Sequence, residues 1–501
     1  MRVLYVAAEC KPFSKAGGVG DVAGELPPAL KEAGIDVEIV TPWYGQTSIT
    51  DYEVPFNGVT ERVGLVQPTL RGVPVHFIKN PTYFETNYLA PNARKPPKAD
   101  PNLFQKDYST PYVDSDEFPF LDDALRFSFF SEACLKLIEA RKPDIVHIND
   151  WVLGYLFGRM AQLGMPQKRV LTIHNIGYQG NLGRDRIAGW TIEAIANDKK
   201  LGPLFTDPRP EWKSINPLRL ALELAHQTNT VSPHYKAEIT QQEDPSRYFE
   251  GGKGLDPFTA RLDREGRLHG ILNGFEYKAQ PSDEGFAETL AKKAEARRAL
   301  AKDFAEEPGL LLGFVGRAVE QKFKLLTEEY DGQSVLEHIL DLPGVSVAIV
   351  ASGQPVYEDF LRGLADRPNL KATIAFDRTK AQQISLGSDV FLMPSLFEPC
   401  GITQMESLAC ATPPLVRWTG GLVDTVRPHT AADGTGFGFD GRSQEEVLRN
   451  LVGAVREAGN LLTRNPDKFR ELQRRGYAER FLWSTAARQY VSDLYEPAVR
   501  A

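Results

Sequence analysis

Cysteine is scarce in this chain of 501 residues. The four cysteines, Cys10, Cys134, Cys400 and Cys410, are widely spaced and form no CxxC pair. Disulfide frameworks and zinc sites both need several cysteines at close, regular spacing. The sequence therefore indicates neither, and we expect a protein of the reducing cytoplasm.

Dense basic runs and long apolar runs are also missing. Lys and Arg number 58 against 66 Asp and Glu, a formal net charge of −8. Nucleic acids and anionic membranes select basic surfaces, so neither is an expected partner. The first apolar stretch meets Glu9, Lys11 and Pro12 before a signal-peptide core could form, and no apolar run reaches transmembrane length. We expect neither export nor membrane insertion.

Short apolar runs alternate instead with helix-compatible stretches, and the length suggests two to three domains. Runs typical of strands buried on both faces of a parallel sheet lie at 2–8, 35–40, 74–78, 144–148, 169–173 and 229–231, with a helix-like stretch at 124–139. This alternation predicts βαβ units.

A second series of the same kind lies at 310–315, 345–350, 372–376 and 390–393. Between the two series, 279–286 is turn-rich and suited to a linker, and we place a domain boundary near residue 270. The predicted fold is α/β, with two doubly wound, Rossmann-like domains. Such domains bind ligands beyond the carboxyl ends of their strands, so functional residues should follow strands. The proline-rich stretch 85–120 predicts a long loop.

The first candidate motif is Lys15-Ala-Gly-Gly-Val-Gly-Asp21, between the first strand and a helix-like stretch at 22–33. A phosphate-binding turn needs this order, because glycines permit positive φ and close approach of backbone N–H groups, and a helix N-terminus attracts anions. Neither GxGxxG nor the Walker pattern is present. The loop fits a ligand cradle and a structural turn equally well.

A second cluster, 397–406, follows the last apolar run. Glu398 would lie in a strand-to-helix turn, followed by backbone N–H groups at 401–403 that could hold phosphate or sugar hydroxyls. Glu406 would lie about two turns along the helix. The spacing alone slightly favours a plainer interpretation, in which Glu398 caps the helix and Glu406 faces solvent.

Charged and polar residues follow other strands as well. Arg317 and Lys322 could neutralise a diphosphate leaving group or form surface ion pairs. Asp150, Trp151 and His174 follow two N-terminal strands, and such convergence favours a binding site over isolated structural roles. No HExxH, Cys/His quartet or GxSxG motif occurs, so a metalloprotease or serine hydrolase has no support.

Motifs along nearly the whole chain become specific when they are taken in order. They are Lys15-Ala-Gly-Gly, His147-Ile-Asn-Asp-Trp151, Thr172-Ile-His-Asn175, Val231-Ser-Pro, Gly270-Ile-Leu-Asn-Gly274, Gly316-Arg with Glu320-Gln-Lys322, Phe397-Glu-Pro-Cys-Gly401 and Thr419-Gly-Gly-Leu-Val-Asp424. In this order they resemble the family of bacterial glycogen synthases and plant starch synthases.

The resemblance implies a GT-B fold, in which two Rossmann-like domains face across a deep cleft and a final helix, here 483–495, crosses back. We therefore expect an N-terminal acceptor-side domain of residues 1–270 plus 480–501, and a nucleotide-sugar-binding domain of residues 271–479. The resemblance also implies the reaction: glucose passes from ADP-glucose to the non-reducing end of an α-1,4-glucan with retention of configuration, ADP is released, and no metal or cofactor takes part.

The family's residue roles carry over where the motifs match. The resemblance implies that Lys15 holds phosphate, that Arg317 and Lys322 stabilise the departing diphosphate, that Glu398 contacts the donor glucose, and that His174 lies beside the anomeric centre. The implied donor-binding set is Gly17, Gly18, Asp21, Asn273, Phe376, Cys400, Gly401, Ile402, Thr403 and Glu406, and the acceptor side is Asp150 with Trp151. Phe376 occupies a position where the family often has a Tyr that stacks on adenine.

The chemistry agrees with these roles. Cleavage of the glucose–phosphate bond builds positive charge on the sugar and negative charge on the diphosphate, so fixed cations and a nearby carboxylate act where charge develops. No residue has the clear position of a protein nucleophile. We therefore expect the acceptor to attack on the leaving-group face, with a phosphate oxygen taking the proton.

Some positions depart from the family pattern. Val19 stands where Leu is usual, Glu276 replaces Asp, and Glu406 restores a second Glu typical of the wider class of retaining transferases. These departures bear on nucleotide preference and acceptor length more than on the reaction class. Two alternatives therefore stay open: a transferase of the same fold that uses UDP-glucose or another acceptor, and a non-catalytic glucan-binding protein.

Overall fold

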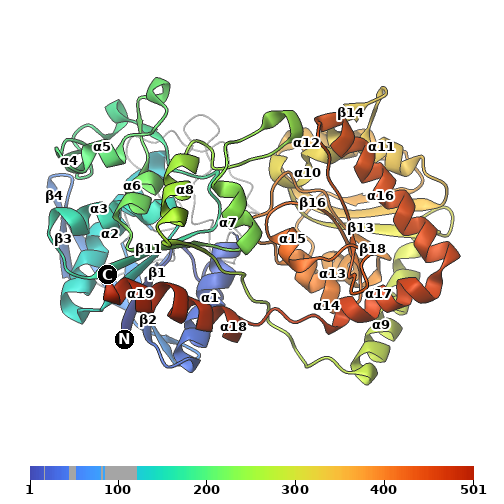
Figure 1. Ribbon diagram of the computed structural model, residues 1–501, viewed down its shortest axis with the longest axis horizontal. Helices are drawn as coiled ribbons and strands as arrows, with labels where there is room; N and C mark the ends of the chain where they lie inside the picture. The colour runs from blue at the N-terminus through green and yellow to red at the C-terminus, as the bar shows by residue number, and fades with distance from the viewer. Residues whose placement is uncertain (16, 45–51, 81–82, 85–120) are drawn as a thin grey trace.

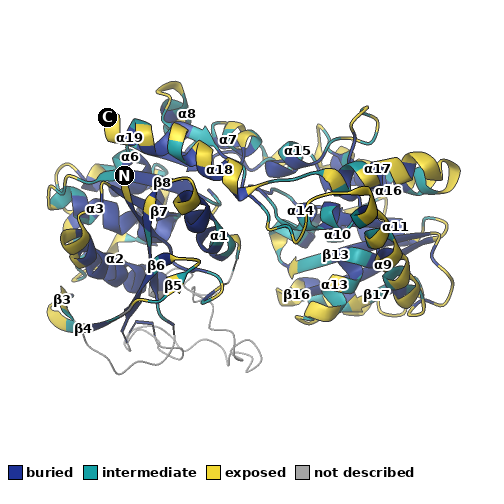
Figure 2. Ribbon diagram, turned by 90° about the horizontal axis from the view of Figure 1, so that it is seen from below, coloured by how far each residue is buried: buried dark blue, intermediate teal, exposed yellow. Residues whose placement is uncertain are grey.

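The computed structural model has two α/β lobes, each built around its own sheet (Figure 1). It describes residues 1–15, 17–44, 52–80, 83–84 and 121–501. The loop expected at 85–120 lies outside the described residues. Figure 2 shows the strands of both lobes largely buried and the outer helix faces exposed. None of the helices in the described ranges combines the length and apolar character needed to cross a bilayer.

The first lobe contains a ten-stranded sheet among the described residues, in the spatial order β12-β11-β8-β7-β1-β2-β6-β4-β3, with β5 paired to β6. The pairs from β12 to β6 are parallel, and β3, β4 and β5 add an antiparallel edge. The strands are β1 (Arg2–Val6), β2 (Asp36–Pro42), β3 (Tyr52–Phe56), β4 (Val59–Val66), β5 (Thr69–Leu70), β6 (Val73–Lys79), β7 (Ile145–Asn149), β8 (Lys168–Ile173), β11 (Gln227–Thr230) and β12 (Leu268–Gly270).

All six apolar runs predicted for the first series form strands of this sheet. The antiparallel edge was not predicted, because its strands are only half buried and their sequences mix polar and apolar residues. In β3, for example, Val54 and Phe56 are buried while Glu53 and Pro55 are exposed. Such a strand lacks the continuous apolar run that marks the centre of a parallel sheet.

The second lobe has a six-stranded parallel sheet in the order β17-β16-β13-β18-β19-β20. Its strands are β13 (Leu310–Ala318), β16 (Val345–Gly353), β17 (Leu370–Thr373), β18 (Val390–Met393), β19 (Pro414–Arg417) and β20 (Phe437–Phe439). The strand predicted at 372–376 begins and ends earlier, because Leu370 is buried at its start whereas Phe376 is 91% exposed.

Helices cover both sheets. Those of the first lobe include α1 (Gly18–Glu32), α2 (Leu121–Arg141), α3 (Gly154–Gln162), α6 (Pro217–Leu224), α7 (Pro233–Ile239) and α8 (Asp256–Arg264). Those of the second lobe include α9 (Asp283–Ala301), α10 (Glu320–Thr327), α11 (Val335–Leu340), α12 (Pro355–Gly363), α13 (Arg378–Gly387), α14 (Thr403–Ala409), α15 (Gly421–Thr425), α16 (Gln444–Arg464) and α17 (Pro466–Ala478).

The linker is shorter than predicted. The stretch 279–286 was expected to be turn-like, but α9 already begins at Asp283. The Ser282 hydroxyl accepts a hydrogen bond from the Gly285 N–H at 3.0 Å and so caps the helix. Ser is a favoured N-cap residue because its side chain satisfies an amide that has no partner within the helix.

The last segment of the chain packs on the first lobe, where both termini lie (Figure 1). It consists of α18 (Trp483–Gln489), a π-helical stretch (Tyr490–Tyr495) and α19 (Glu496–Arg500). Ala487, Tyr490 and Leu494 are fully buried against the apolar face that includes Val3 and Val37. This burial removes apolar surface from water and holds the end of the chain on the first lobe.

A buried chain of hydrogen bonds reinforces this packing. The Asn229 side-chain amide donates to the Tyr490 hydroxyl at 3.0 Å, and Thr172 donates to Asn229 Oδ1 at 2.6 Å. Thr172 therefore accepts from His147 Nε2, at 2.7 Å, which leaves His147 Nδ1 to accept from the Tyr495 hydroxyl at 2.8 Å. Burial lowers the pKa of His147 to about 3, so the ring is neutral as this pattern requires.

Replacing Tyr495→Phe should lower the free energy of unfolding by about 1–3 kcal/mol, because it leaves His147 Nδ1 buried without its donor. The measurement is the denaturation midpoint of the variant against the parent. Tyr330→Phe is the matched control, since its hydroxyl makes no hydrogen bond within the described residues. Equal effects of the two changes would contradict the prediction.

Candidate active site

The glycine-rich loop lies at the carboxyl edge of the first sheet, between β1 and α1. Lys15 Nζ contacts Asp21 Oδ2 at 2.6 Å, and the Lys15 side chain is 49% exposed. Asp21 lies in the first turn of α1, where a negative charge interacts favourably with the helix dipole. Helix α1 begins at Gly18, four residues earlier than predicted, so Gly17 is its N-cap.

The glycines of this loop do not adopt positive φ. Gly17 has φ of −150°, and neither Gly18 nor Gly20 has a positive φ. A Cβ at Gly20 would lie 3.2 Å from Glu9 Oε2, and a Cβ at Gly24 would lie 2.6 Å from a backbone oxygen of the preceding loop. The expectation of left-handed backbone was therefore wrong. Close contact with buried groups explains Gly20 and, within α1, Gly24, whereas a Cβ at Gly18 would meet no atom within 4 Å.

Glu9 is the site residue that the sequence analysis missed. It is fully buried beneath the loop, and its Oε2 accepts a hydrogen bond from the Gly17 N–H at 3.2 Å. A charged residue directly after a buried strand, followed by a glycine loop, was the available signal. The carboxylate holds the backbone of the loop in place.

Asp150 and Trp151, which are expected on the acceptor side, directly follow β7. Asp150 has a positive φ of 59°, and its Oδ1 accepts a hydrogen bond from the His174 N–H at 2.7 Å. Burial raises the pKa of the Asp150 carboxyl to about 7. Trp151 is buried, and Gly180 packs directly on its ring, where a Cβ would lie 2.1 Å from Cε3.

The His174 side chain is oriented by its neighbours in the sheet. Its Nε2 lies 2.8 Å from Asn149 Oδ1, and the same oxygen accepts from the Tyr5 hydroxyl at 2.9 Å. Nε2 therefore carries the proton, because the amide oxygen can only accept. Burial lowers the pKa of His174 to about 3, so the imidazole is neutral at physiological pH.

On the second lobe, Lys322 and Glu398 form an ion pair that joins α10 to the loop after β18. The Glu398 side chain is 8% exposed and Lys322 22%. Ser395 also donates to Glu398 Oε2, at 3.2 Å. Arg317, near the end of β13, is exposed and has no hydrogen bond or ion pair within the described residues.

The loop from Cys400 to Thr403 is held by close backbone packing. Gly401 has φ of +74° and lies against Gln404, while Ile402 is the N-cap of α14. Helix α14 begins only at Thr403, so Glu406 lies one turn along the helix rather than the two turns predicted. Its side chain is therefore nearer the loop than the sequence suggested.

Glu406 of the second lobe lies close enough to charged residues of the first lobe for them to change its pKa. Burial raises the pKa of its carboxyl, Lys15 opposes the shift and Asp21 adds to it. The glycine loop of the first lobe therefore lies near the first turn of α14.

Further contacts join the lobes beside this point. The Ser232 hydroxyl donates to the Pro399 carbonyl at 2.7 Å, and Glu238 of α7 accepts from the Gly420 N–H at 2.9 Å. The glycine loop of the first lobe and the segment from Cys400 to Glu406 of the second thus face each other.

Two further predicted donor residues, Asn273 and Phe376, have opposite surroundings: one is buried and the other exposed. Asn273 is buried in the linker and hydrogen bonds to Cys400, and its Oδ1 has no partner among the described residues. Phe376 instead presents its ring to solvent just before α13. Burial raises the pKa of the Cys400 thiol to about 12, so that group stays protonated and is a poor nucleophile.

Metal ligands are not clustered in the described part of the chain: no group of three or more His, Cys, Asp or Glu side chains there could hold an ion. All four cysteines are free thiols.

Comparison with known proteins supports the family resemblance along the length of the chain. A family model for the starch synthase catalytic domain matches residues 2–261, and one for glycosyl transferases group 1 matches residues 301–457. A glycogen synthase from Koribacter versatilis is 34% identical, covering 99% of this chain and 98% of its own length. A glycogen synthase from Deinococcus deserti is 31% identical and covers 100% of both chains.

A solved structure supports the same family. The catalytic domain of starch synthase IV from Arabidopsis thaliana, determined with ADP and acarbose bound, has a TM-score of 0.77 at 26% identity and covers 100% of this chain and 99% of that one. Given the motifs, the two facing sheets and relatives above 30% identity over the full length, the chain belongs to the family of bacterial glycogen synthases and plant starch synthases, retaining glycosyltransferases of the GT-B fold.

Proposed function

We propose that this chain transfers glucose from ADP-glucose to the non-reducing end of an α-1,4-glucan, with retention of configuration, and releases ADP. The observation that carries the proposal is the Lys322–Glu398 ion pair at the strand ends of the second lobe, opposite the Lys15–Asp21 pair of the first. A nucleotide diphosphate sugar needs cations at its phosphates and a carboxylate at its sugar, and this arrangement supplies both.

The cations are available to a diphosphate. Arg317 is unpaired within the described residues, and the Lys15 and Lys322 ammonium groups each have one carboxylate partner that an incoming phosphate oxygen can replace. As the glucose–phosphate bond breaks, negative charge grows on the leaving diphosphate, so fixed cations stabilise the transition state more than the ground state. Because these side chains supply the charge, we propose that the reaction needs no metal.

Glu398 is held by Ser395 and Lys322, which aim its carboxylate at the position proposed for the donor glucose. When a diphosphate draws Lys322 away, the carboxylate is free to bind sugar hydroxyls or to stabilise positive charge at the anomeric carbon. Cys400 is protonated and buried, so it offers no covalent route. We therefore propose direct attack by the acceptor hydroxyl on the leaving-group face, with its proton passing to a phosphate oxygen.

His174 and Asp150 orient the sugar at the other lobe. The neutral His174 ring, held by Asn149, offers hydrogen bonding without charge beside the anomeric centre. Asp150, with Trp151 beneath it, is proposed to accept a hydrogen bond from the glucan. The open face of Phe376 is available to stack on the nucleotide base.

We propose that this reaction takes place in the cytoplasm. The four free thiols fit a reducing compartment.

The proposal is tested by following glucose incorporation into a maltooligosaccharide from ADP-glucose and, in parallel, from UDP-glucose, without added metal. Transfer from ADP-glucose should be the faster. Equal or faster transfer from UDP-glucose would establish the alternative donor, and no transfer from either would favour a different acceptor or a non-catalytic glucan-binding protein.

In the same assay, Lys322→Ala and Glu398→Ala should each lower kcat by about 100- to 1,000-fold, the loss typical of removing a group that stabilises transition-state charge. Lys324→Ala is the matched control, because Lys324 lies on the same helix but pairs with Glu320 at the surface. Activity that survives in Lys322→Ala, or falls equally in Lys324→Ala, would contradict the assigned roles.

Asp150 should impose a pH dependence on transfer. Its pKa of about 7 means that the Asp150 carboxyl group is mostly protonated below pH 7 and mostly ionised above it. Since only the ionised form is a full acceptor, kcat/KM should rise with pH through about 7. Asn tolerates the same positive φ, so Asp150→Asn should keep the backbone but lose this rise of kcat/KM with pH, the acid limb of the profile.

The measurement is the pH profile of kcat/KM for both proteins. Asp366→Asn, an exposed substitution outside the site, should keep the parent profile. A limb that persists unchanged in Asp150→Asn would assign the ionisation to another group.

A further inference from the structure

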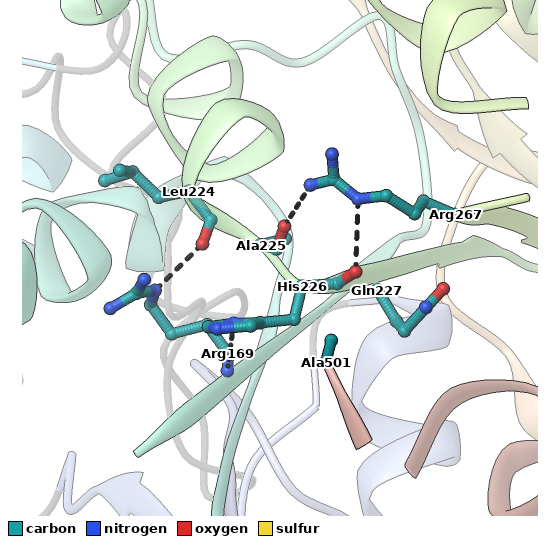
Figure 3. Close-up of a pocket in the computed structure, with 7 residues that line it drawn as sticks. All are labelled: Arg169, Leu224, Ala225, His226, Gln227, Arg267 and Ala501. Atoms are coloured by element: carbon teal, nitrogen blue, oxygen red, sulfur yellow. Dashed lines mark hydrogen bonds between the residues drawn. The ribbon is translucent and has the colours of Figure 1, made fainter. Parts of the chain in front are cut away.

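A cavity of about 380 Å³ opens at the amino ends of β8, β11 and β12, the edge of the first sheet opposite the candidate active site. Figure 3 shows the residues that line it, which are Arg169, Leu224, Ala225, His226, Gln227, Arg267 and Ala501. Its volume falls in the range of small-molecule sites.

The backbone acceptors around this cavity are already occupied. Arg169 Nε donates to the Leu224 carbonyl at 2.8 Å, and Arg267 donates to the carbonyls of Ala225 and, at 3.2 Å, His226 (Figure 3). The two arginines thereby satisfy carbonyl groups at and just beyond the end of α6. No free backbone acceptor is left among these three residues.

The side-chain polar atoms of the lining that remain uncommitted are donors. Arg169 Nη1 and Nη2 have no acceptor among the described residues. His226 Nδ1 accepts from the Arg169 N–H at 3.1 Å, so the ring proton lies on Nε2, which has no partner there either. Gln227 is only 7% exposed; its Oε1 faces His269 Nε2 at 3.1 Å, and its amide nitrogen has no acceptor in the described ranges.

The local charge is positive. Burial, and then the neighbouring charges of Arg169, Lys168 and Arg267, lower the pKa of His226 to about 4, so the ring stays neutral and keeps a single donor. Arg267 is paired with Glu265 at 2.7 Å, whereas Arg169 has no acidic partner among the described residues. A partly buried guanidinium without a counter-charge is costly unless an anion joins it.

We propose that this cavity binds a phosphate group, either as free phosphate or as the terminal group of a small metabolite. The Arg169 fork, the His226 Nε2–H and the Gln227 amide provide donors from three side chains, which suits a tetrahedral oxyanion. The site is separate from the donor-phosphate site, because Arg169 lies near the start of β8 and His174 follows the end of the same strand. The inference does not depend on the proposed reaction.

The experiment uses the resonances of the eight histidine rings of the full chain, with isotope-labelled histidine, during titration with orthophosphate and, separately, with glycerol phosphate. The His226 signal is assigned from a His226→Gln spectrum, and the His174 signal reports the candidate active site. The His226 signal should shift and saturate with each probe. Tighter binding of glycerol phosphate would identify a metabolite ester as the ligand, and equal binding would identify phosphate itself.

Gln227→Glu keeps the side-chain shape and the acceptor for His269 but replaces a donor with a negative charge. It should raise the phosphate concentration needed for half-saturation by about tenfold or more, as should Arg169→Gln. Gln489→Glu, an exposed change elsewhere, should leave the titration as in the parent.

Two outcomes would overturn the proposal. One is a His226 signal that stays unmoved while phosphate is raised to its solubility limit. The other is a His226 titration that is unchanged in Gln227→Glu, which would show non-specific screening by an adventitious ion only.

Discussion

The parallel arrangement of strands is the constraint on which the rest of this molecule depends. Parallel neighbours end at the same edge of a sheet, so residues far apart in the chain, such as Asp150 and His174, meet there. The second lobe repeats the arrangement with Arg317 and Glu398. Because α7 and the loop around Pro399 hold the two lobes together beside these edges, the glycine loop of the first lobe lies near Glu406 of the second.

The site is charged, yet most of its charges are paired without any ligand. Lys15 is matched by Asp21 and Lys322 by Glu398. These pairs reduce the cost of holding like charges close together on each lobe. A diphosphate that exchanges for the carboxylates would keep the cations neutralised and release Glu398 for the sugar, so binding and chemistry would use the same pairs.

Sequence reasoning located the glycine loop but gave the wrong reason for its glycines. The glycine pattern suggested positive φ, whereas Glu9 crowds a Cβ at Gly20 and the Lys11 carbonyl excludes one at Gly24. Glu9 itself was missed, because a Glu that follows a strand is more often exposed, and only its place before the glycine loop indicated that it is buried. The cavity at the amino ends of β8, β11 and β12 was equally invisible, since the free donors around Arg169 appear only when the carbonyls at and beyond the end of α6 are assigned to their partners.

The sequence by itself determined the two series of buried strands, the polar residues that follow them and, through the order of motifs, the family. Those properties are local: an apolar run predicts a strand wherever that run lies along the chain. The contact of Tyr495 with His147 and the approach of Lys15 to Glu406 were decided by tertiary structure. Each depends on packing between segments tens to hundreds of residues apart, and neither propensity nor spacing along the chain encodes that distance.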